Sequence, residues 1–280
     1  MVLGTVERIP RRLSRRAERC SLTVRATGVM RVLDLFSGIG GLSLGLHRAG
    51  LRTVAFCEIE PYCRSVLAER FPGVPIYDDV RGITAERLAA DGIGVDVVAG
   101  GFPCQDISFA GSGAGLAGER SGLWREMWRI VGDVRPRFVL VENVAALLVR
   151  GMGDVLGDLA RIGYDAEWSV VPACSVGAPH VRRRVFIVAY PNREYGRPRL
   201  RDTAAQPIGA IQAIDSLESA RAGWRARLAN PSALYGGADG VPHGMERNRA
   251  IGNAVVPQVA EAIGRAIMRA ANVTGGAHSE

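Results

Sequence analysis

The sequence predicts an α/β fold built on a mostly parallel β-sheet, and three observations support this. A short apolar run at 32–33 leads into a glycine-rich turn and a helix-like stretch, the order found where a parallel strand meets a ligand. Two further runs, at 95–99 and 138–141, are almost wholly apolar, as in strands buried on both faces. Polar or reactive residues follow these runs directly, at the edge where parallel sheets carry their ligand sites.

The first strand and turn are expected to be followed by carboxylates at the ends of two more strands. A run at 53–56 ends near Glu58, about twenty residues after the turn, where nucleotide sites hold a carboxylate for ribose hydroxyls. Asp79 follows a third candidate strand at 74–76, and an acidic group there suits an adenine amino group. A glycine-rich turn alone is weak evidence, but the three features together indicate a nucleotide-type site.

The strand at 95–99 ends in a glycine pair, followed by Phe102-Pro103-Cys104-Gln105. Cys104 is therefore expected just past a buried strand, on a loop stiffened by Pro103. A lone cysteine is most often a buried structural thiol. The convergence of other chemical groups on the same edge favours a nucleophile instead.

Two later elements are expected to bring an acid and two arginines to that edge. Glu142 follows the strand at 138–141, and a partly desolvated Glu beside a nucleophile is a candidate proton donor with a raised pKa. The strand at 185–189 follows three arginines, so it reaches the same edge only if it runs antiparallel. Arg182 and Arg184 then share one face by strand alternation, whereas Arg183 is interpreted as a solvated turn residue.

In this order the motifs resemble those of the DNA (cytosine-5)-methyltransferase family. The resemblance covers roughly 31–190 and 247–271, and the quoted motifs are DLFSGIGG, CEIEPY, DDV, GGFPCQDIS, RSGLW, ENV, HVRRR and GNAVVP. It implies an S-adenosylmethionine-dependent methyltransferase fold with one antiparallel strand and a small irregular target-recognition lobe. The chain departs from the usual pattern at Ile59, where an aromatic residue is common, and at His180, where Gln is common.

The resemblance also implies the catalytic roles. Cys104 would add to C6 of cytosine, Glu142 would hold and protonate the N3 edge, Arg184 would contact the O2 side and Arg182 would support it. Because C5 is unreachable in a stacked duplex, the target base would be flipped out of double-stranded DNA. Gln105, Ser108 and the glycine-rich stretch 111–115 would form a loop that closes over the site.

The implied cofactor is S-adenosyl-L-methionine, and no metal is expected. The expected cofactor contacts come from the matched motifs, and they are Phe36, Ser37, Gly38, Ile39, Gly40, Gly41, Glu58, Ile59, Asp79, Val80, Gly101, Pro103, Leu123, Asn253 and Ala254.

Four regions are expected: an Arg-rich disordered extension at 1–29, a catalytic domain at 30–190 with 247–271, a reduced recognition region at 191–246, and a flexible tail at 272–280. The first region is either an arm that contacts DNA or residues ahead of a true start at Met30, and the second interpretation is slightly favoured. Candidate DNA contacts in the third are Arg197, Arg199, Arg201, Arg221, Trp224, Arg225 and Arg227.

The net charge of +7 favours a phosphate backbone as partner over a membrane. Five cysteines without CxxC spacing fit a reducing compartment, so a cytoplasmic, nucleoid-associated monomer is expected, with a cognate restriction endonuclease as a candidate partner. Two alternatives stay open: an RNA cytosine-5 methyltransferase and a DNA-binding protein that has lost catalysis.

Overall fold

A computed structural model describes residues 29–103, 122–178, 180–192 and 244–275, and the side chains of 249–271 within the last range. Seven strands form one sheet in the order β3-β2-β1-β4-β5-β7-β6. The strands are β1 (Arg31–Leu35), β2 (Arg52–Cys57), β3 (Ile76–Tyr77), β4 (Val97–Gly100), β5 (Phe138–Val144), β6 (Tyr164–Pro172) and β7 (Arg183–Pro191).

The helices that flank these strands are mostly short. They are α1 (Gly41–Arg48), α2 (Pro61–Arg70), α3 (Ala85–Ala90), α4 (Gly122–Val134), α5 (Leu147–Arg150), α6 (Met152–Arg161), α10 (Gly244–Asn253) and α11 (Pro257–Gly275). Two 3-10 turns, η1 (Val80–Gly82) and η4 (Ala173–Val176), complete the described elements.

Strand directions confirm the predicted sheet. Strands β1 to β5 pair in parallel, whereas β7 pairs antiparallel with both β5 and β6. The strand β7 begins at Arg183 rather than at residue 185, because Arg183 pairs with Pro172 of β6 and Arg184 pairs with Val144 of β5. Pairing on both sides therefore holds the arginines in extended backbone. The edge strand β6 has no apolar run to announce it in the sequence.

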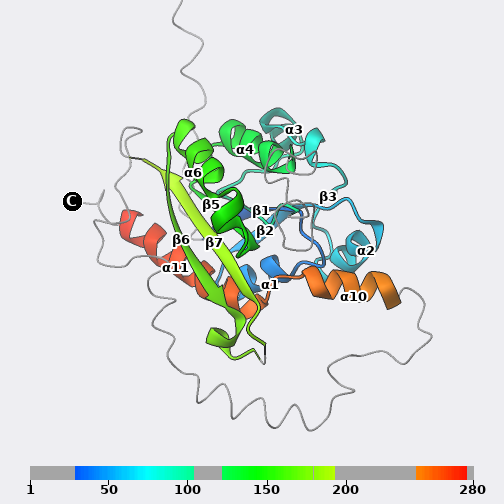
Figure 1. The fold of residues 1–280 in the computed structure, drawn as a ribbon. Coiled ribbons are helices and arrows are strands. Elements are labelled where there is room, and N and C mark those ends of the chain that lie inside the picture. The colour runs from blue at the N-terminus through cyan, green and yellow to red at the C-terminus, as the bar shows by residue number, and fades with distance from the viewer. Residues whose placement is uncertain (1–28, 104–121, 179, 193–243, 276–280) are drawn as a thin grey trace, which may run out of the picture.

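Helices cover the two faces of the sheet (Figure 1). Helices α3, α4 and α6 pack on one face, where Leu33, Val98 and Val139 join their apolar side chains in one core. Helices α1 and α11 pack on the other face, over Val32 and Leu140. The alternation of neighbouring strand residues between these two cores explains why the strands are apolar throughout.

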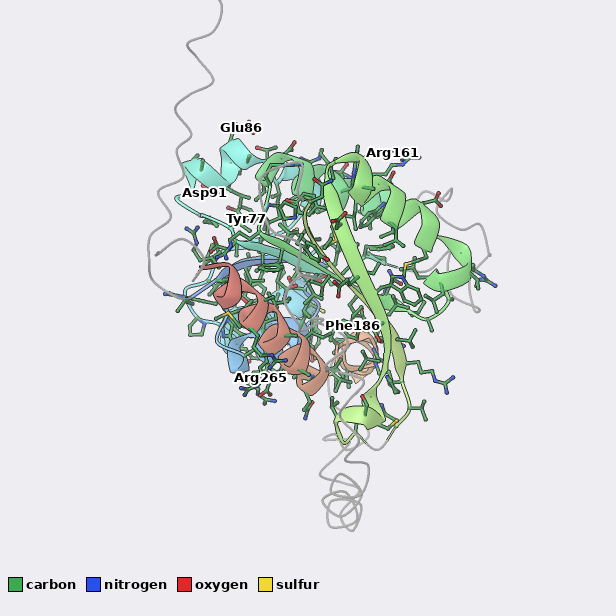
Figure 2. The ribbon with its side chains drawn as sticks, turned by 90° about the vertical axis from the view of Figure 1, so that its left-hand side faces the viewer. Tyr77, Glu86, Asp91, Arg161, Phe186 and Arg265 are labelled. Atoms are coloured by element: carbon green, nitrogen blue, oxygen red, sulfur yellow. The ribbon has the colours of Figure 1, made fainter. Side chains whose placement is uncertain are left out.

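The last helix carries an apolar stripe at Val259, Ile263 and Ile267, and all three are fully or almost fully buried. Burying each such side chain is worth about 1.5–3 kcal/mol. Figure 2 shows Phe186 between β7 and α11, and Arg265 on the outer side of the helix, where it pairs with Glu261.

Helices α1 and α11 approach closely through glycines. A Cβ atom on Gly45 would lie 2.2 Å from the carbonyl oxygen of Pro257, and one on Gly264 would lie 2.7 Å from the Cβ of Ala49. The chain following the glycine-rich turn thus contacts the start of α11 directly. Within the described part of the chain, no helix is both long and apolar enough to cross a membrane.

Candidate active site

The carboxyl ends of five neighbouring strands form one edge of the sheet. The Cα pairing aligns one residue from each strand in a row, namely Tyr77, Cys57, Leu35, Gly100 and Val141. The residue after each of them lies at the same edge, and these residues are Asp78, Glu58, Phe36, Gly101 and Glu142. The register thereby brings expected cofactor residues and the expected acid, far apart in sequence, to one edge.

The glycine-rich turn follows β1 in left-handed backbone. Phe36, Gly38 and Gly40 have φ angles of 55°, 53° and 80°, which glycine adopts readily and other residues rarely. Ser37 stabilises the turn because its hydroxyl donates to the carbonyl oxygen of Asp34 at 2.6 Å. A Cβ atom on Gly38 would meet nothing within 4 Å, so open space adjoins the turn at this point.

Glu58 is held against that turn. Its Oε2 accepts from the backbone N–H of Gly38 at 2.7 Å, and its Oε1 accepts from the N–H of Glu60 at 2.8 Å. Ile59, beside it, has 67% of its surface exposed. A fixed carboxylate next to an exposed apolar side chain suits a sugar hydroxyl pair with a flat base stacked beside it.

The other expected cofactor residues differ in what their side chains do. Asp79 accepts from the N–H of Arg81 at 2.9 Å and so caps η1. Val80 is buried in the core, and Leu123 packs against the same core. Asn253 is exposed at the end of α10, and Ala254 follows it half-buried.

Glu142 is buried in β5, with 8% of its surface exposed. The Nε atom of Arg184 lies 3.1 Å from its Oε1, yet that oxygen has no directed hydrogen bond among the described residues. Burial raises the pKa of Glu142 to about 7, and the two nearby arginines only partly oppose this. The carboxyl can therefore hold or release a proton near neutral pH.

The pairing in the sheet explains how Arg184 reaches Glu142. Glu142 lies opposite Phe186, so Arg184, two residues earlier on β7, projects from the same face one diagonal step away. The sequence expectation that Arg184 and Glu142 meet at one edge is realised in this geometry.

The glycine pair at the end of β4, Gly100 and Gly101, makes room for the neighbouring strands on both sides. A Cβ atom on Gly100 would lie 2.5 Å from the carbonyl oxygen of Leu35, and one on Gly101 would lie 2.7 Å from Oε2 of Glu142. Gly101 is thus in contact with the acid, a role that sequence reasoning missed. The glycine pair in the sequence does not reveal which residue approaches Gly101, because the contact with Glu142 arises from tertiary packing.

Asn143 fixes the start of the loop that leads to Cys104. Its Nδ2 donates to the carbonyl oxygen of Phe102 at 3.2 Å, and its Oδ1 accepts from the N–H of Val144 at 2.9 Å. The ring of Phe102 packs on Trp124, with centroids 5.4 Å apart. Pro103 is the last residue that the structure describes in this loop, so Cys104, Gln105 and Ser108 lie outside the described residues.

Arg182 extends from the same edge to the last turn of α10 and the residue that follows this helix. Its Nη1 donates to the carbonyl oxygen of Gly252 at 2.7 Å, and its Nη2 donates to that of Ala254 at 3.0 Å. The two arginines that the sequence groups together thus have different partners. The candidate DNA contacts Arg197, Arg199, Arg201, Arg221, Trp224, Arg225 and Arg227 lie in the part of the chain that the structure leaves undescribed.

Asp34 is a second buried carboxyl, which sequence reasoning did not single out. It is fully buried at the end of β1, where its Oδ2 accepts from the hydroxyl of Ser43 at 2.5 Å. Ser43 in turn accepts from the hydroxyl of Thr53 at 2.7 Å. Burial raises the pKa of Asp34 to about 7, more than the Ser43 hydrogen bond lowers it. Its only signal in the sequence is an acid inside an apolar strand.

The other thiols near this edge are poor nucleophiles. Burial and the charge of Glu58 raise the pKa of Cys57 to about 12 and that of Cys63 to about 11. A thiol must ionise to attack, so both of these cysteines serve packing.

Comparison with known proteins agrees with this geometry. Residues 30–224 match the family model of the C-5 cytosine-specific DNA methylases. The chain is 40% identical over 168 residues to the Type II methyltransferase M2.BsuMI of Bacillus subtilis, covering 57% of this chain and 42% of that protein. It is 33% identical over 212 residues to M1.HphI of Haemophilus parahaemolyticus, covering 72% and 56%. The matched part of the chain thus spans about half the length of these relatives.

Solved structures share the fold. A prophage-encoded protein of E. coli, studied as a candidate DNA modification methyltransferase, aligns with a TM-score of 0.51 and 29% identity over 61% of this chain and 51% of its own. Spodoptera frugiperda DNMT2 aligns with a TM-score of 0.50 and 22% identity over 61% and 52%, a likeness of fold alone. The family model covers well over half of the chain, and the matched range includes the glycine-rich turn, Glu142 and the two arginines. The chain therefore belongs to the C-5 cytosine-specific DNA methylase family.

Proposed function

We propose that this protein transfers a methyl group from S-adenosyl-L-methionine to C5 of cytosine in double-stranded DNA. The observation that carries the proposal is Glu142, a buried carboxyl with a pKa of about 7 that touches Gly101, beside the loop leading to Cys104. Family membership supports the same reaction class.

The edge of the sheet fits the adenosyl part of the cofactor on three observations. Open space adjoins Gly38, the carboxylate of Glu58 is fixed for ribose hydroxyls, and Ile59 is exposed where a base would stack. When bound, the cofactor would supply an electrophilic methyl group on a sulfonium. Phe36 to Gly41 and Asn253 would hold its methionine end, and Asp79 would face the adenine amino group.

Cytosine C5 needs activation before it can accept a methyl group. In the proposed reaction the Cys104 thiolate bonds to C6 of a flipped-out cytosine, and Glu142 gives its proton to N3 as the ring electrons shift toward C5. Glu142 is then a carboxylate beside Arg184, and the arginine stabilises its charge. C5 gains the methyl group and loses its proton to a base, N3 returns its proton to Glu142, and the thiolate leaves.

Asn143 would set the position of the nucleophile in this scheme. It bonds the backbone of Phe102, only two residues before Cys104, and Phe102 is itself anchored on Trp124. A rigid start to the loop limits how far the thiol can drift from C6. The stretch 105–115 would close over the flipped base, and the 191–246 region would read the DNA sequence.

Bisulfite sequencing of plasmid DNA from cells expressing this protein tests the proposal. Methylcytosine is expected at one short motif with the wild-type chain and with Cys174→Ala, a matched control in which a half-buried thiol elsewhere is removed. Cys104→Ala should leave no methylcytosine while DNA binding persists.

Two results would overturn the proposal. Methylation of RNA instead of plasmid DNA would favour an RNA cytosine-5 methyltransferase. DNA binding without methylation in the wild-type sample would favour a protein that has lost catalysis.

The setting of the reaction is proposed from the relatives. They are named Type II methyltransferases, so we propose a restriction–modification role with a cognate restriction endonuclease, for a cytoplasmic, nucleoid-associated monomer. A neighbouring endonuclease whose cleavage is blocked at the methylated motif would support the role. If every endonuclease encoded beside this protein still cleaved the methylated DNA, the restriction–modification role would be contradicted.

A further inference from the structure

Arg182 bridges two parts of the candidate site that are far apart in the sequence. It directly precedes β7, the strand that carries Arg184 to Glu142, and its guanidinium bonds the carbonyl oxygens of Gly252 and Ala254. These atoms belong to the last turn of α10 and the residue after it. The hydrogen bonds therefore link the base side of the edge to the segment at 252–257.

Each of these hydrogen bonds satisfies a group that a helix leaves unpaired. The final carbonyl oxygens of a helix have no partner within it and carry the negative end of the helix dipole. A guanidinium with two parallel donors at that end is a favourable cap, since the bonds are assisted by charge. Arg182 thus acts as a side-chain cap of α10.

The two acceptors flank one residue, Asn253. Because the carbonyl oxygens of Gly252 and Ala254 are both fixed, the peptide units around Asn253 are held in one orientation. The side chain of Asn253 itself is exposed. The resemblance assigns Asn253 to the cofactor, so its orientation bears on cofactor binding.

The same segment is pressed against the helix that follows the glycine-rich turn. A Cβ atom on Gly41 would lie 2.4 Å from the carbonyl oxygen of Val255. Earlier in α10, Nη2 of Arg249 lies 3.9 Å from Oε1 of Glu60. The backbone N–H of Glu60 donates to the carboxylate of Glu58. Residues 249–255 therefore run along the cofactor half of the edge, from the ribose carboxylate to the turn.

We propose that Arg182 is a positioning residue for the cofactor, which acts by holding Asn253 toward the methionine end of the pocket rather than by contacting cytosine. The proposal rests on the proposed function, because it takes S-adenosylmethionine as the ligand of this edge. It separates the roles of two arginines that stand two residues apart in the motif: Arg184 serves the base through Glu142, and Arg182 serves the cofactor through α10.

The test compares Arg182→Met, Arg182→Lys and Arg183→Met in the full chain. Met keeps the length of the side chain but removes both hydrogen bonds, and Lys keeps the charge without the paired donors. Arg183 is exposed beside the site and is the matched control. Binding of S-adenosylhomocysteine is measured by calorimetry, and KM for the methyl donor and kcat are measured on a plasmid carrying the motif found by bisulfite sequencing.

Arg182→Met is expected to weaken cofactor binding and to raise KM for the donor by about tenfold or more, as the loss of two charge-assisted bonds implies. The change in kcat at saturating donor should be smaller than the change in KM. Arg182→Lys should recover part of the affinity, and Arg183→Met should match the wild type. Should the Met variant fail to fold, the KM and kcat of the Lys variant decide.

A loss confined to kcat, with donor affinity unchanged, would overturn the proposal and assign Arg182 to contacts with the target cytosine. Unchanged affinity and unchanged kcat would overturn it equally. Failure of the proposed function is distinguishable, since the wild-type chain would then neither bind S-adenosylhomocysteine nor methylate the plasmid.

Discussion

Glu58 follows β2 and Glu142 lies in β5, at the same edge of the sheet with β1 and β4 between them, and the two carboxyls are almost equally buried, at 7% and 8% exposure. Both oxygens of Glu58 accept backbone N–H groups, whereas Oε1 of Glu142 forms an ion pair with Arg184 but has no directed hydrogen bond among the described residues. Equal burial thus produces two different groups. Glu58 is fixed by two backbone donors, as the proposed ribose contact requires, and Glu142 is left able to exchange a proton.

Replacing Glu142 tests the catalytic half of this comparison and should have the largest effect. Glu142→Gln keeps the shape but cannot release a proton, so kcat is expected to fall by about 10²–10⁴, the usual contribution of a general acid. Cofactor affinity should stay unchanged. Steady-state methyl transfer and calorimetry check this. The control is Glu261→Gln, which removes only a surface pair with Arg265, and equal activity of both variants would refute the role.

Glu58→Gln tests the binding half. The amide NH₂ would face the N–H of Gly38 or of Glu60, so one backbone donor loses its acceptor. Cofactor affinity should fall by about tenfold, in line with the loss of a hydrogen bond to a charged group. In contrast to Glu142→Gln, kcat at saturating donor should change little. Affinity equal to that of the wild type would mean that Glu58 only supports the turn.

Gly101→Ala tests whether the close contact between Gly101 and Glu142 matters for activity. The new methyl group would lie 2.7 Å from Oε2 of Glu142, so the carboxyl must move. We expect kcat to fall by about tenfold, which corresponds to about 1.4 kcal/mol in the barrier.

Gly153→Ala on α6 is the control for Gly101→Ala, since a Cβ atom there meets nothing within 4 Å. Its activity should match that of the wild type, and its melting temperature should be equal or slightly higher, because alanine favours a helix more than glycine does. If Gly101→Ala were fully active, the contact with Glu142 would have no functional weight.

Asp34→Asn isolates a smaller effect, on the pH dependence of stability. The pKa of Asp34 is raised by burial to about 7 from an ordinary value near 3.8. Between these pH values the unfolded chain releases the proton and the folded chain keeps it, so folding stability declines as pH rises through this window. Melting temperatures from pH 4 to 8 should fall less in Asp34→Asn than in the wild type. Parallel curves would show that Asp34 is ionised throughout.

The sequence was sufficient for the parts of this site that depend on order along the chain. An apolar strand followed by a polar residue predicts what stands at the edge, which is why Glu58, Glu142 and the glycine-rich turn could be named in advance. The extension of β7 through Arg183 and the edge strand β6 could not, because both arise from pairing between strands rather than from their own apolar content.

Contacts between distant segments were the second limit. The partners of Arg182 lie 70 and 72 residues further along the chain, and the acid behind Gly101 comes from another strand. Spacing within the motif groups Arg182 with Arg184, although in the folded chain Arg182 bonds Gly252 and Ala254 and Arg184 pairs with Glu142. The buried row of Asp34, Ser43 and Thr53 is hidden for the same reason, since each looks like an ordinary polar residue in its own element.

The close packing of α1 on α11 has a consequence for protein engineering. Glycines at 45 and 264 join an early helix to the last one, and Arg182 ties the start of β7 to the end of α10. The chain between β7 and α10 therefore leaves from and returns to fixed points on the sheet and its helices. Loop-closure entropy rises by only about 0.6 kcal/mol for each doubling of loop length. A longer segment from a relative, grafted between these anchors, should therefore cost little in stability. The sheet and its helices would stay the same while the grafted segment is exchanged.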